Sequence, residues 1–106
     1  LMASGMNGQN FAFTGYLPID KSDRTRALRN LESLTKKTGQ TQIFMETPYR
    51  NHQLFDTIIK VCSNNTKLCI ASDITLPSEN IKTKTIAEWK QEKININKKP
   101  AIFLIN

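Results

Sequence analysis

The chain has 106 residues, of which 39% are hydrophobic and 23% are charged, and its formal net charge is +6. This length and composition predict one globular domain with one core, and no segment approaches the roughly 18 consecutive apolar residues of a membrane span, so we expect no membrane partner. The positive charge favours anionic partners such as nucleic acid, but the simpler interpretation is a solvated basic surface.

The N-terminal part of the chain predicts a strand followed by a helix. Residues 11–15 alternate as in a short strand, and the Gly-Tyr-Leu-Pro segment at 15–18 ends it. Apolar residues at helical spacing then predict a helix over about 23–37. Ser22 is the expected N-cap of this helix, and Gly39 is the expected left-handed C-cap.

A second strand runs directly into a second helix. Residues 42–46 contain an unbroken apolar run, which predicts an inner strand covered on both faces. Thr47 can cap the helix that follows, and Pro48 suits its first position. Glu46 stands at the carboxyl end of the strand, where ligands bind in open α/β sheets. From spacing alone, the simpler interpretation is that Glu46 or Arg50 only satisfies nearby backbone groups.

The second half of the chain predicts three more strands and one short helix. Residues 67–73 form a buried strand, and residues 81–85 form an edge strand whose lysines discourage further pairing. Thr85 and Glu88 form the capping box of a short helix, and residues 101–106 form the last strand. The predicted fold class is therefore α/β (α+β), a mixed sheet of about five strands with helices packed on it, in the order β-α-β-α-β-β-α-β.

Few residues are suited to metal binding or catalysis. Cys62 and Cys69 stand in apolar surroundings without a CxxC spacing, which predicts reduced core thiols and a cytoplasmic protein. His52 is the only histidine, so the sequence predicts neither a metal site nor a serine triad. Glu46 and Asp73 can meet as an acid/base pair if their strands are neighbours, or they can equally bind hydroxyls or amines of a ligand.

Basic residues gather at the start of the first predicted helix. They are Lys21, Arg24, Arg26 and Arg29. Cations at this end oppose the helix dipole, so an anionic partner would explain them, although Asp20 and Asp23 compensate in part. They are not interleaved with aromatic residues as in a base-stacking platform for single-stranded nucleic acid.

Three motifs occur in order along the chain. They are Gly15-Tyr16-Leu17-Pro18, Met45-Glu46-Thr47-Pro48-Tyr49-Arg50 and Ala71-Ser72-Asp73-Ile74-Thr75-Leu76. Together with the closing segments KTIAEW and PAIFLI, they resemble the C-terminal domain of the tetrapyrrole (corrin/porphyrin) methylase superfamily. Within that superfamily, the pattern is most similar to the ribosomal small-subunit RNA 2'-O-ribose methyltransferase I family.

The resemblance implies a methyltransferase that uses S-adenosyl-L-methionine, bound in a cleft between two α/β domains of a protein that commonly forms homodimers. Residues 1–10 would be the tail of the interdomain connection and residues 11–106 the C-terminal domain, so the N-terminal domain would be missing. The resemblance places the cofactor against Met45, Glu46, Thr47, Ser72, Asp73 and Ile74. It places the substrate near Lys21, Arg24, Arg26 and Arg50. No catalytic residue is assigned, because methyl transfer requires mainly in-line positioning.

The methyl acceptor implied by the resemblance is either the ribose 2'-hydroxyl of ribosomal RNA or a tetrapyrrole. Ser72 and Leu76 stand where the RNA-modifying pattern carries arginine and lysine. We expect the isolated chain to be inactive until the N-terminal domain is restored. The alternative function is a non-catalytic basic module that binds nucleic acid, and a structural role in dimerisation is compatible with the methyltransferase interpretation.

Overall fold

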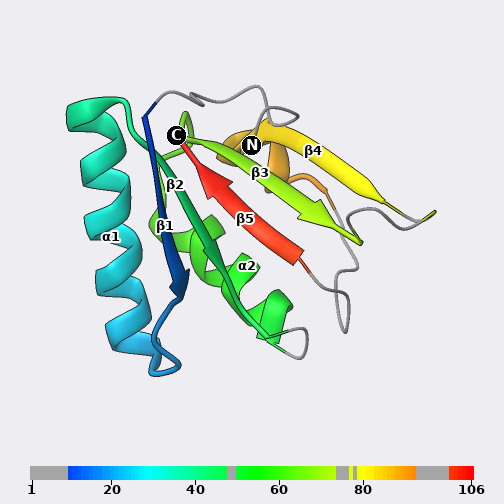
Figure 1. Cartoon of the computed structure of the whole chain (residues 1–106), viewed down its shortest axis with the longest axis horizontal. Coiled ribbons are helices and arrows are strands. Elements are labelled where there is room, and N and C mark those ends of the chain that lie inside the picture. The colour runs from blue at the N-terminus through cyan, green and yellow to red at the C-terminus, as the bar shows by residue number, and fades with distance from the viewer. Residues whose placement is uncertain (1–9, 48–49, 74–76, 78, 93–100) are drawn as a thin grey trace.

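The computed structural model describes residues 10–47, 50–73, 77, 79–92 and 101–106, which form a five-stranded mixed sheet and three helices (Figure 1). The elements in chain order are β1 (Phe11–Tyr16), α1 (Lys21–Thr38), β2 (Thr41–Met45), α2 (Asn51–Val61), β3 (Lys67–Ser72), β4 (Asn80–Thr85), α3 (Ile86–Trp89) and β5 (Ala101–Ile105). The predicted fold class and element order are confirmed. Within the described parts of the chain, no helix combines the length and the apolar character needed to cross a bilayer.

The strands lie in the order β1-β2-β5-β3-β4 across the sheet. β1 pairs with β2 in parallel, whereas β5 is antiparallel to both β2 and β3, and β4 is antiparallel to β3. β1, β2 and β3 therefore run in one direction, and their carboxyl ends meet at the same edge of the sheet. The prediction that residues 81–85 form an edge strand is confirmed, because β4 pairs only with β3.

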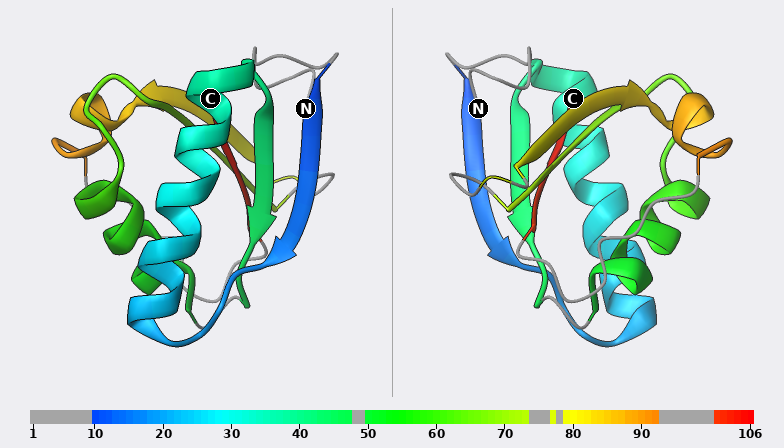
Figure 2. Two further views of the ribbon diagram at one scale, coloured as in Figure 1. Left: turned by 90° about the vertical axis from the view of Figure 1, so that its left-hand side faces the viewer. Right: turned by 90° about the vertical axis from the view of Figure 1, so that its right-hand side faces the viewer.

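The helices pack on one face of the sheet (Figure 2). Apolar side chains of α1 and α2 bury this face, and Phe44 of β2 stacks on Phe103 of β5 with ring centroids 6.0 Å apart. The prediction that β2 is covered on both faces is wrong for the described residues. Phe44 is fully buried on the helix side, whereas Ile43 and Met45 on the other face are only half-buried, since no described helix covers them.

The ends of α1 are set by an aspartate and a glycine. Asp20 is the N-cap, and its side chain accepts a hydrogen bond of 3.0 Å from the backbone N–H of Asp23. The prediction of Ser22 as the N-cap is therefore wrong, because the helix already begins at Lys21. The predicted C-cap is confirmed, since Gly39 has a left-handed backbone with a φ of 72°.

Of the N-caps predicted for α2 and α3, the first is wrong and the second is confirmed. The N-cap of α2 is Arg50, without a side-chain hydrogen bond, so the prediction of Thr47 as its cap is wrong. Thr47 lies in the preceding turn, where its carbonyl accepts the N–H of Arg50, and Pro48 lies outside the described residues. The capping box of Thr85 and Glu88 at the start of α3 is confirmed.

Both cysteines are free and buried, which confirms the prediction of reduced core thiols. Burial, followed by the nearby carboxylate of Glu32, raises the pKa of Cys62 to about 12. Burial also raises the pKa of Cys69. Because the thiolate is the reactive form, neither side chain is suited to nucleophilic chemistry near neutral pH.

We predict that Cys62 resists alkylation in the folded chain. At pH 8, iodoacetamide should label it at least ~100-fold more slowly than in concentrated guanidinium chloride, because burial excludes the reagent and its thiol stays protonated. Mass spectrometry of tryptic peptides over a time course gives both rates. The Cys69→Ala variant serves as a control that isolates Cys62, and equal labelling of the folded and unfolded variant would contradict the prediction.

Candidate functional site

The carboxyl ends of β1, β2 and β3 share one edge of the sheet with the beginnings of α1 and α2 (Figure 1). Helix beginnings carry free N–H groups and a partial positive charge, and strand ends at such edges are the usual ligand sites of α/β sheets. The described residues of all three sequence motifs lie at or next to these strand ends, so this edge is the candidate functional site.

A buried carboxylate stands at this edge between two arginines. Glu46 is 4% exposed and follows β2 directly. Its Oε2 lies 3.9 Å from Nη1 of Arg24 on α1, and its Oε1 lies 3.5 Å from Nη1 of Arg50 at the start of α2. Oε1 also accepts the backbone N–H of Thr47 at 2.7 Å. We call Glu46, Arg24 and Arg50 the Glu46 cluster, and it ties the end of β2 to both helices.

The Glu46 cluster has unused hydrogen-bonding capacity. The 3.9 Å separation between Glu46 Oε2 and Arg24 Nη1 is too long for a hydrogen bond. Among the described residues, Glu46 Oε2 and the Nε and Nη1 atoms of Arg24 have no hydrogen-bond partner. Buried polar atoms are nearly always hydrogen-bonded, so a buried carboxylate oxygen without a partner indicates a position that can receive a ligand donor.

A cavity of about 430 Å³ adjoins the Glu46 cluster. We call it the strand-end cavity, and its lining residues are Tyr16, Leu17, Pro18, Ile19, Glu46, Thr47 and Arg50. The structure thus brings the first and second sequence motifs together. Mostly apolar walls with a few polar groups are typical of pockets for small organic ligands.

A second cavity of about 410 Å³ lies between α1 and α2. We call it the interhelix cavity, and its lining residues are Ile19, Lys21, Arg24, Thr25, Gln53, Asp56, Thr57, Lys60 and Val61. Its side chains carry three cations and one carboxylate. Arg24 therefore contacts this cavity as well as Glu46.

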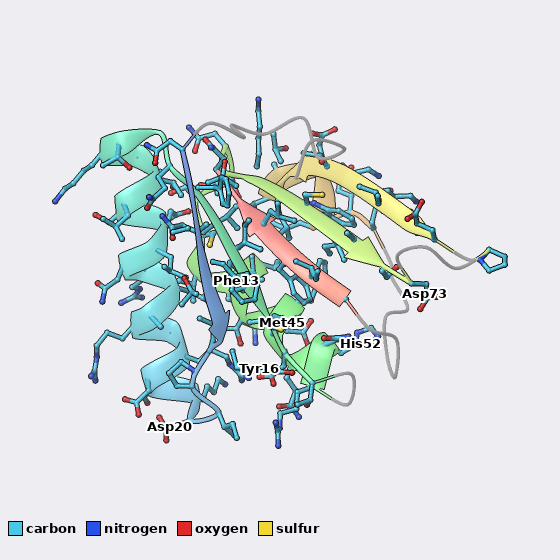
Figure 3. The ribbon with its side chains drawn as sticks, in the orientation of Figure 1. Phe13, Tyr16, Asp20, Met45, His52 and Asp73 are labelled. Carbon is cyan, nitrogen blue, oxygen red and sulfur yellow. The ribbon has the colours of Figure 1, made fainter. Side chains whose placement is uncertain are left out.

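The residues predicted to bind the cofactor fall into two groups on either side of β5. Residues 45–47 lie at the end of β2, whereas Ser72 and Asp73 are buried at the end of β3 (Figure 3). Because β5 separates the two strands, the condition for an acid/base pair of Glu46 and Asp73 is not met. Ile74 lies outside the described residues.

Asp73 has an unusual backbone conformation. Its φ is 51°, and it is the only non-glycine residue with a positive φ among the described residues. It is also 8% exposed. Aspartate tolerates the left-handed region better than most residues, but the conformation still costs free energy, and such positions concentrate at functional sites. Sequence reasoning could not find this signal, because it is a property of the folded backbone.

The residues predicted to face the substrate do not form one patch. Arg24 is 4% exposed and belongs to the Glu46 cluster. Arg50 lines the strand-end cavity and Lys21 lines the interhelix cavity. Arg26 lines neither cavity and pairs with a neighbouring aspartate in solvent at 3.7 Å. The cations of α1 therefore point to different surroundings, which the linear cluster did not reveal.

Sequence reasoning missed Tyr16 as a site residue. It lines the strand-end cavity and is 64% exposed at the end of β1 (Figure 3). The available signal was the glycine that precedes it in the first motif, since Gly15 has a φ of 81° and sits in a strand irregularity.

His52 lies in the first turn of α2 and is half-buried (Figure 3). Across the described ranges, no group of three or more histidine, cysteine, aspartate or glutamate side chains is placed to hold a metal ion. The chemistry of the described part of the edge therefore rests on the Glu46 cluster and the strand ends.

Sequence comparison relates the chain to ribosomal RNA small subunit methyltransferase I. It is 34% identical over 108 aligned residues to the protein of that name from Buchnera aphidicola subsp. Schizaphis graminum, and the alignment covers 99% of this chain and 36% of the relative. It is 33% identical over 95 residues to the protein of the same name from Halalkalibacterium halodurans, and this alignment covers 87% of the chain and 31% of the relative. The chain thus spans about one third of the length of the curated relatives it matches. No family model matches the chain.

Solved structures share the fold. The methyltransferase CobJ matches with a TM-score of 0.59 at 14% identity, over 99% of this chain and 44% of that chain. Uroporphyrin-III C-methyltransferase from Thermus thermophilus, complexed with S-adenyl homocysteine, matches with a TM-score of 0.53 at 15% identity, over 99% of this chain and 48% of that chain. The sequence relatives and the shared fold together confirm the resemblance found in the three motifs.

We predict that the charge of Glu46 holds this edge together. Glu46→Gln keeps the shape of the side chain but leaves Arg24 with a buried and poorly compensated charge, so it should destabilise the chain by about 3–5 kcal/mol. Urea denaturation measures the change. Arg24→Met combined with Glu46→Gln should cost at least ~1 kcal/mol less than the sum of the single changes.

The matched control for this prediction is Asp23→Asn, which removes a carboxylate from the exposed ion pair with Arg26. It should change stability by no more than about 0.5 kcal/mol. If Glu46→Gln were as mild as this control, the Glu46 cluster would not be a structural constraint.

Proposed function

We propose that this chain, a relative of ribosomal RNA small subunit methyltransferase I, is the C-terminal domain of an S-adenosylmethionine-dependent methyltransferase. Residues 1–10 are then the tail of an interdomain connection, and residues 11–106 form one wall of the cleft that holds cofactor and acceptor. The observation that carries the proposal is the buried Glu46 carboxylate beside the strand-end cavity, whose Oε2 has no hydrogen-bond partner among the described residues. The names of the sequence relatives and the fold shared with CobJ support it.

The residues at this edge fit the chemistry of S-adenosylmethionine. The cofactor combines a flat adenine ring with ribose hydroxyls and an ammonium group. The apolar walls of the strand-end cavity suit a flat ring, and Glu46 Oε2 can accept a hydrogen bond from a hydroxyl or amine. One structural neighbour is itself complexed with S-adenyl homocysteine. We therefore assign the cofactor contacts to Met45, Glu46, Thr47, Ser72, Asp73 and Ile74.

The substrate side is assigned to cations with different tasks. Arg50 and Lys21 line the two cavities and can contact an anionic acceptor. Arg24 is a positioning residue, because its contact with Glu46 fixes the carboxylate on β2. Arg26 stays in the proposal as an outer contact for a large substrate, since its side chain is 74% exposed.

The bound cofactor would supply a methyl group activated on a sulfonium. The chain's own residues then have to hold the two reactants in line, which is where most of the rate enhancement of such a reaction originates. A carboxylate fixed from both helices serves this purpose because its position is determined by packing. A general acid/base pair is not required, in agreement with the separation of Glu46 from the end of β3.

We propose ribosomal RNA ribose as the acceptor, with a tetrapyrrole as the second possibility. The names of the sequence relatives and the net charge of +6 favour RNA. The fold shared with uroporphyrin-III C-methyltransferase keeps the tetrapyrrole in the proposal. We further propose a cytoplasmic homodimer, and the two free thiols fit a reducing compartment.

We predict that S-adenosylhomocysteine binds the longer parent protein but binds this chain at least ~100-fold more weakly, because the chain supplies one wall of the site. Isothermal titration calorimetry of the product into both proteins measures the difference. A folded parent that binds no product would overturn the methyltransferase proposal. Salt-dependent RNA binding without cofactor binding would then support the alternative, a non-catalytic nucleic-acid module.

We also predict that Asp73→Arg in the parent weakens S-adenosylhomocysteine binding at least ~10-fold, because it places a bulky cation at the β3 end of the cleft. Asp73→Gly is the informative companion, since glycine adopts a positive φ without strain and keeps the backbone. Glu92→Arg, just beyond α3 at the opposite edge of the sheet, is the charge-matched control. Affinity unchanged in Asp73→Arg would remove this residue from the site.

A further inference from the structure

Three aromatic side chains form an exposed row along β1. Phe11, Phe13 and Tyr16 are 51%, 61% and 64% exposed. We call these three residues the aromatic row, and Figure 3 labels two of them on the sheet. Large apolar side chains that gather in the open are typical of interaction sites, because burying them on the molecule itself would be favourable.

A β-bulge aligns the aromatic row. Strict alternation along β1 would turn Tyr16 toward the helices, away from Phe13. The register shifts between Phe13 and Gly15, so that Phe13 pairs with Ile43 and Tyr16 pairs with Met45. These two partners lie two residues apart on β2 and therefore share a face. Gly15 permits the bulge with its φ of 81°. The three aromatic residues pair with Thr41, Ile43 and Met45, which alternate with the core residue Phe44, so they lie on the face opposite the helices.

On this face the central strands are buried, whereas β1 and β4 at the two edges of the sheet carry exposed residues. Cys69 of β3 and Leu104 of β5 lie on the same face and are 0% and 4% exposed. Ile43, beside the aromatic row on β2, is half-buried. The three rings of the aromatic row are therefore exposed at the edge of the sheet, whereas the middle of the same face is buried.

The aromatic row leads into the candidate site. Tyr16 lines the strand-end cavity together with Arg50, whose side chain is 36% exposed. A ligand that lies along the rings thus meets a guanidinium at the end of β1. Flat apolar groups linked by anions complement this arrangement, and unpaired nucleic acid has that chemistry: its bases stack on aromatic rings and its phosphates attract cations.

We propose that the aromatic row binds unpaired bases of an RNA strand and guides it into the cleft at the Glu46 cluster. This inference rests on the proposed function with RNA as the acceptor. Phe11 and Phe13 lie about 6.6 Å apart along the strand. Sheet aromatics that stack two or three bases are an established mode of reading single-stranded RNA. The stacking discriminates unpaired from paired RNA, because bases inside a duplex are not free to stack on protein.

The test measures RNA affinity of this chain after removal of the rings. A fluorescein-labelled single-stranded oligoribonucleotide is titrated with the chain and with its Phe13→Leu/Tyr16→Leu variant, and anisotropy is followed. Leucine keeps apolar contact but has no ring face. Affinity should fall about 5-fold or more for each ring removed. A blunt duplex of the same sequence should show no such loss.

Leu34→Ala is the matched control, because Leu34 is an exposed apolar residue on α1 with 43% exposure. It should leave the RNA affinity unchanged. Circular dichroism of each variant shows that the fold is retained. Unchanged affinity of a folded double variant, or no RNA binding by the unchanged chain, would overturn the inference.

Sedimentation equilibrium tests the competing possibility that the aromatic row is an interface between copies of the chain. A wild-type dimer that dissociates in Phe13→Lys, with RNA affinity unaffected, would make the aromatic row an interface between copies and would overturn its role in RNA binding. Titration of S-adenosylhomocysteine into the parent protein distinguishes a failure of this inference from a failure of the proposed function. If the parent binds S-adenosylhomocysteine while the leucine variant binds RNA normally, only this inference fails. If the folded parent binds no product, the proposed function fails.

Discussion

The buried carboxylate of Glu46 is the constraint on which the candidate site depends. A carboxylate that is 4% exposed carries a desolvation cost of several kcal/mol unless opposite charge and hydrogen bonds compensate it. The compensation comes from Arg24 of α1, Arg50 at the start of α2 and the N–H of Thr47. Both helices are therefore fixed relative to the end of β2 by one side chain. The shape of the strand-end cavity follows, since its walls are the segments that this contact holds in place.

The position of β5 determines how this edge of the sheet can be used. An antiparallel strand between β2 and β3 places its amino end between two carboxyl ends, which separates the Glu46 cluster from Asp73. In the proposed function the two groups are therefore separate contact points for an extended ligand, because the condition for a catalytic pair is not met. Two separated strand ends can supply contacts from one side of such a ligand only. This is the physical reason for proposing that a second wall, from the rest of a longer protein, completes it.

Features fixed by neighbours in sequence could be predicted, and features fixed across the sheet could not. The helical spacing of apolar residues, Gly39 as a C-cap and the Thr85 capping box all depend on contacts within a few residues, and the structure confirms them. Asp20 was missed as the N-cap of α1 because Ser22 is an equally good cap by residue type, and only the exact start of the helix separates them. The burial of Arg24 depends on the packing of α1 beside the end of β2, and the separation of Glu46 from Asp73 depends on strand order. Local sequence patterns encode neither of these.

The Gly-Tyr-Leu-Pro motif shows how one short segment serves the core, the cavity and the open face together. Gly15 allows the bulge, which turns Tyr16 outward and shifts the phase of every later side chain. Leu17 consequently points inward and is 4% exposed in the core, while Pro18 lines the cavity on the way to α1. A Cβ at position 15 would lie 3.8 Å from the ring of Phe13, which is an ordinary van der Waals contact, so there is space for a Cβ at this position. The glycine is needed for its positive φ, and the backbone conformation at this single position therefore decides whether Tyr16 can take part in both the strand-end cavity and the aromatic row.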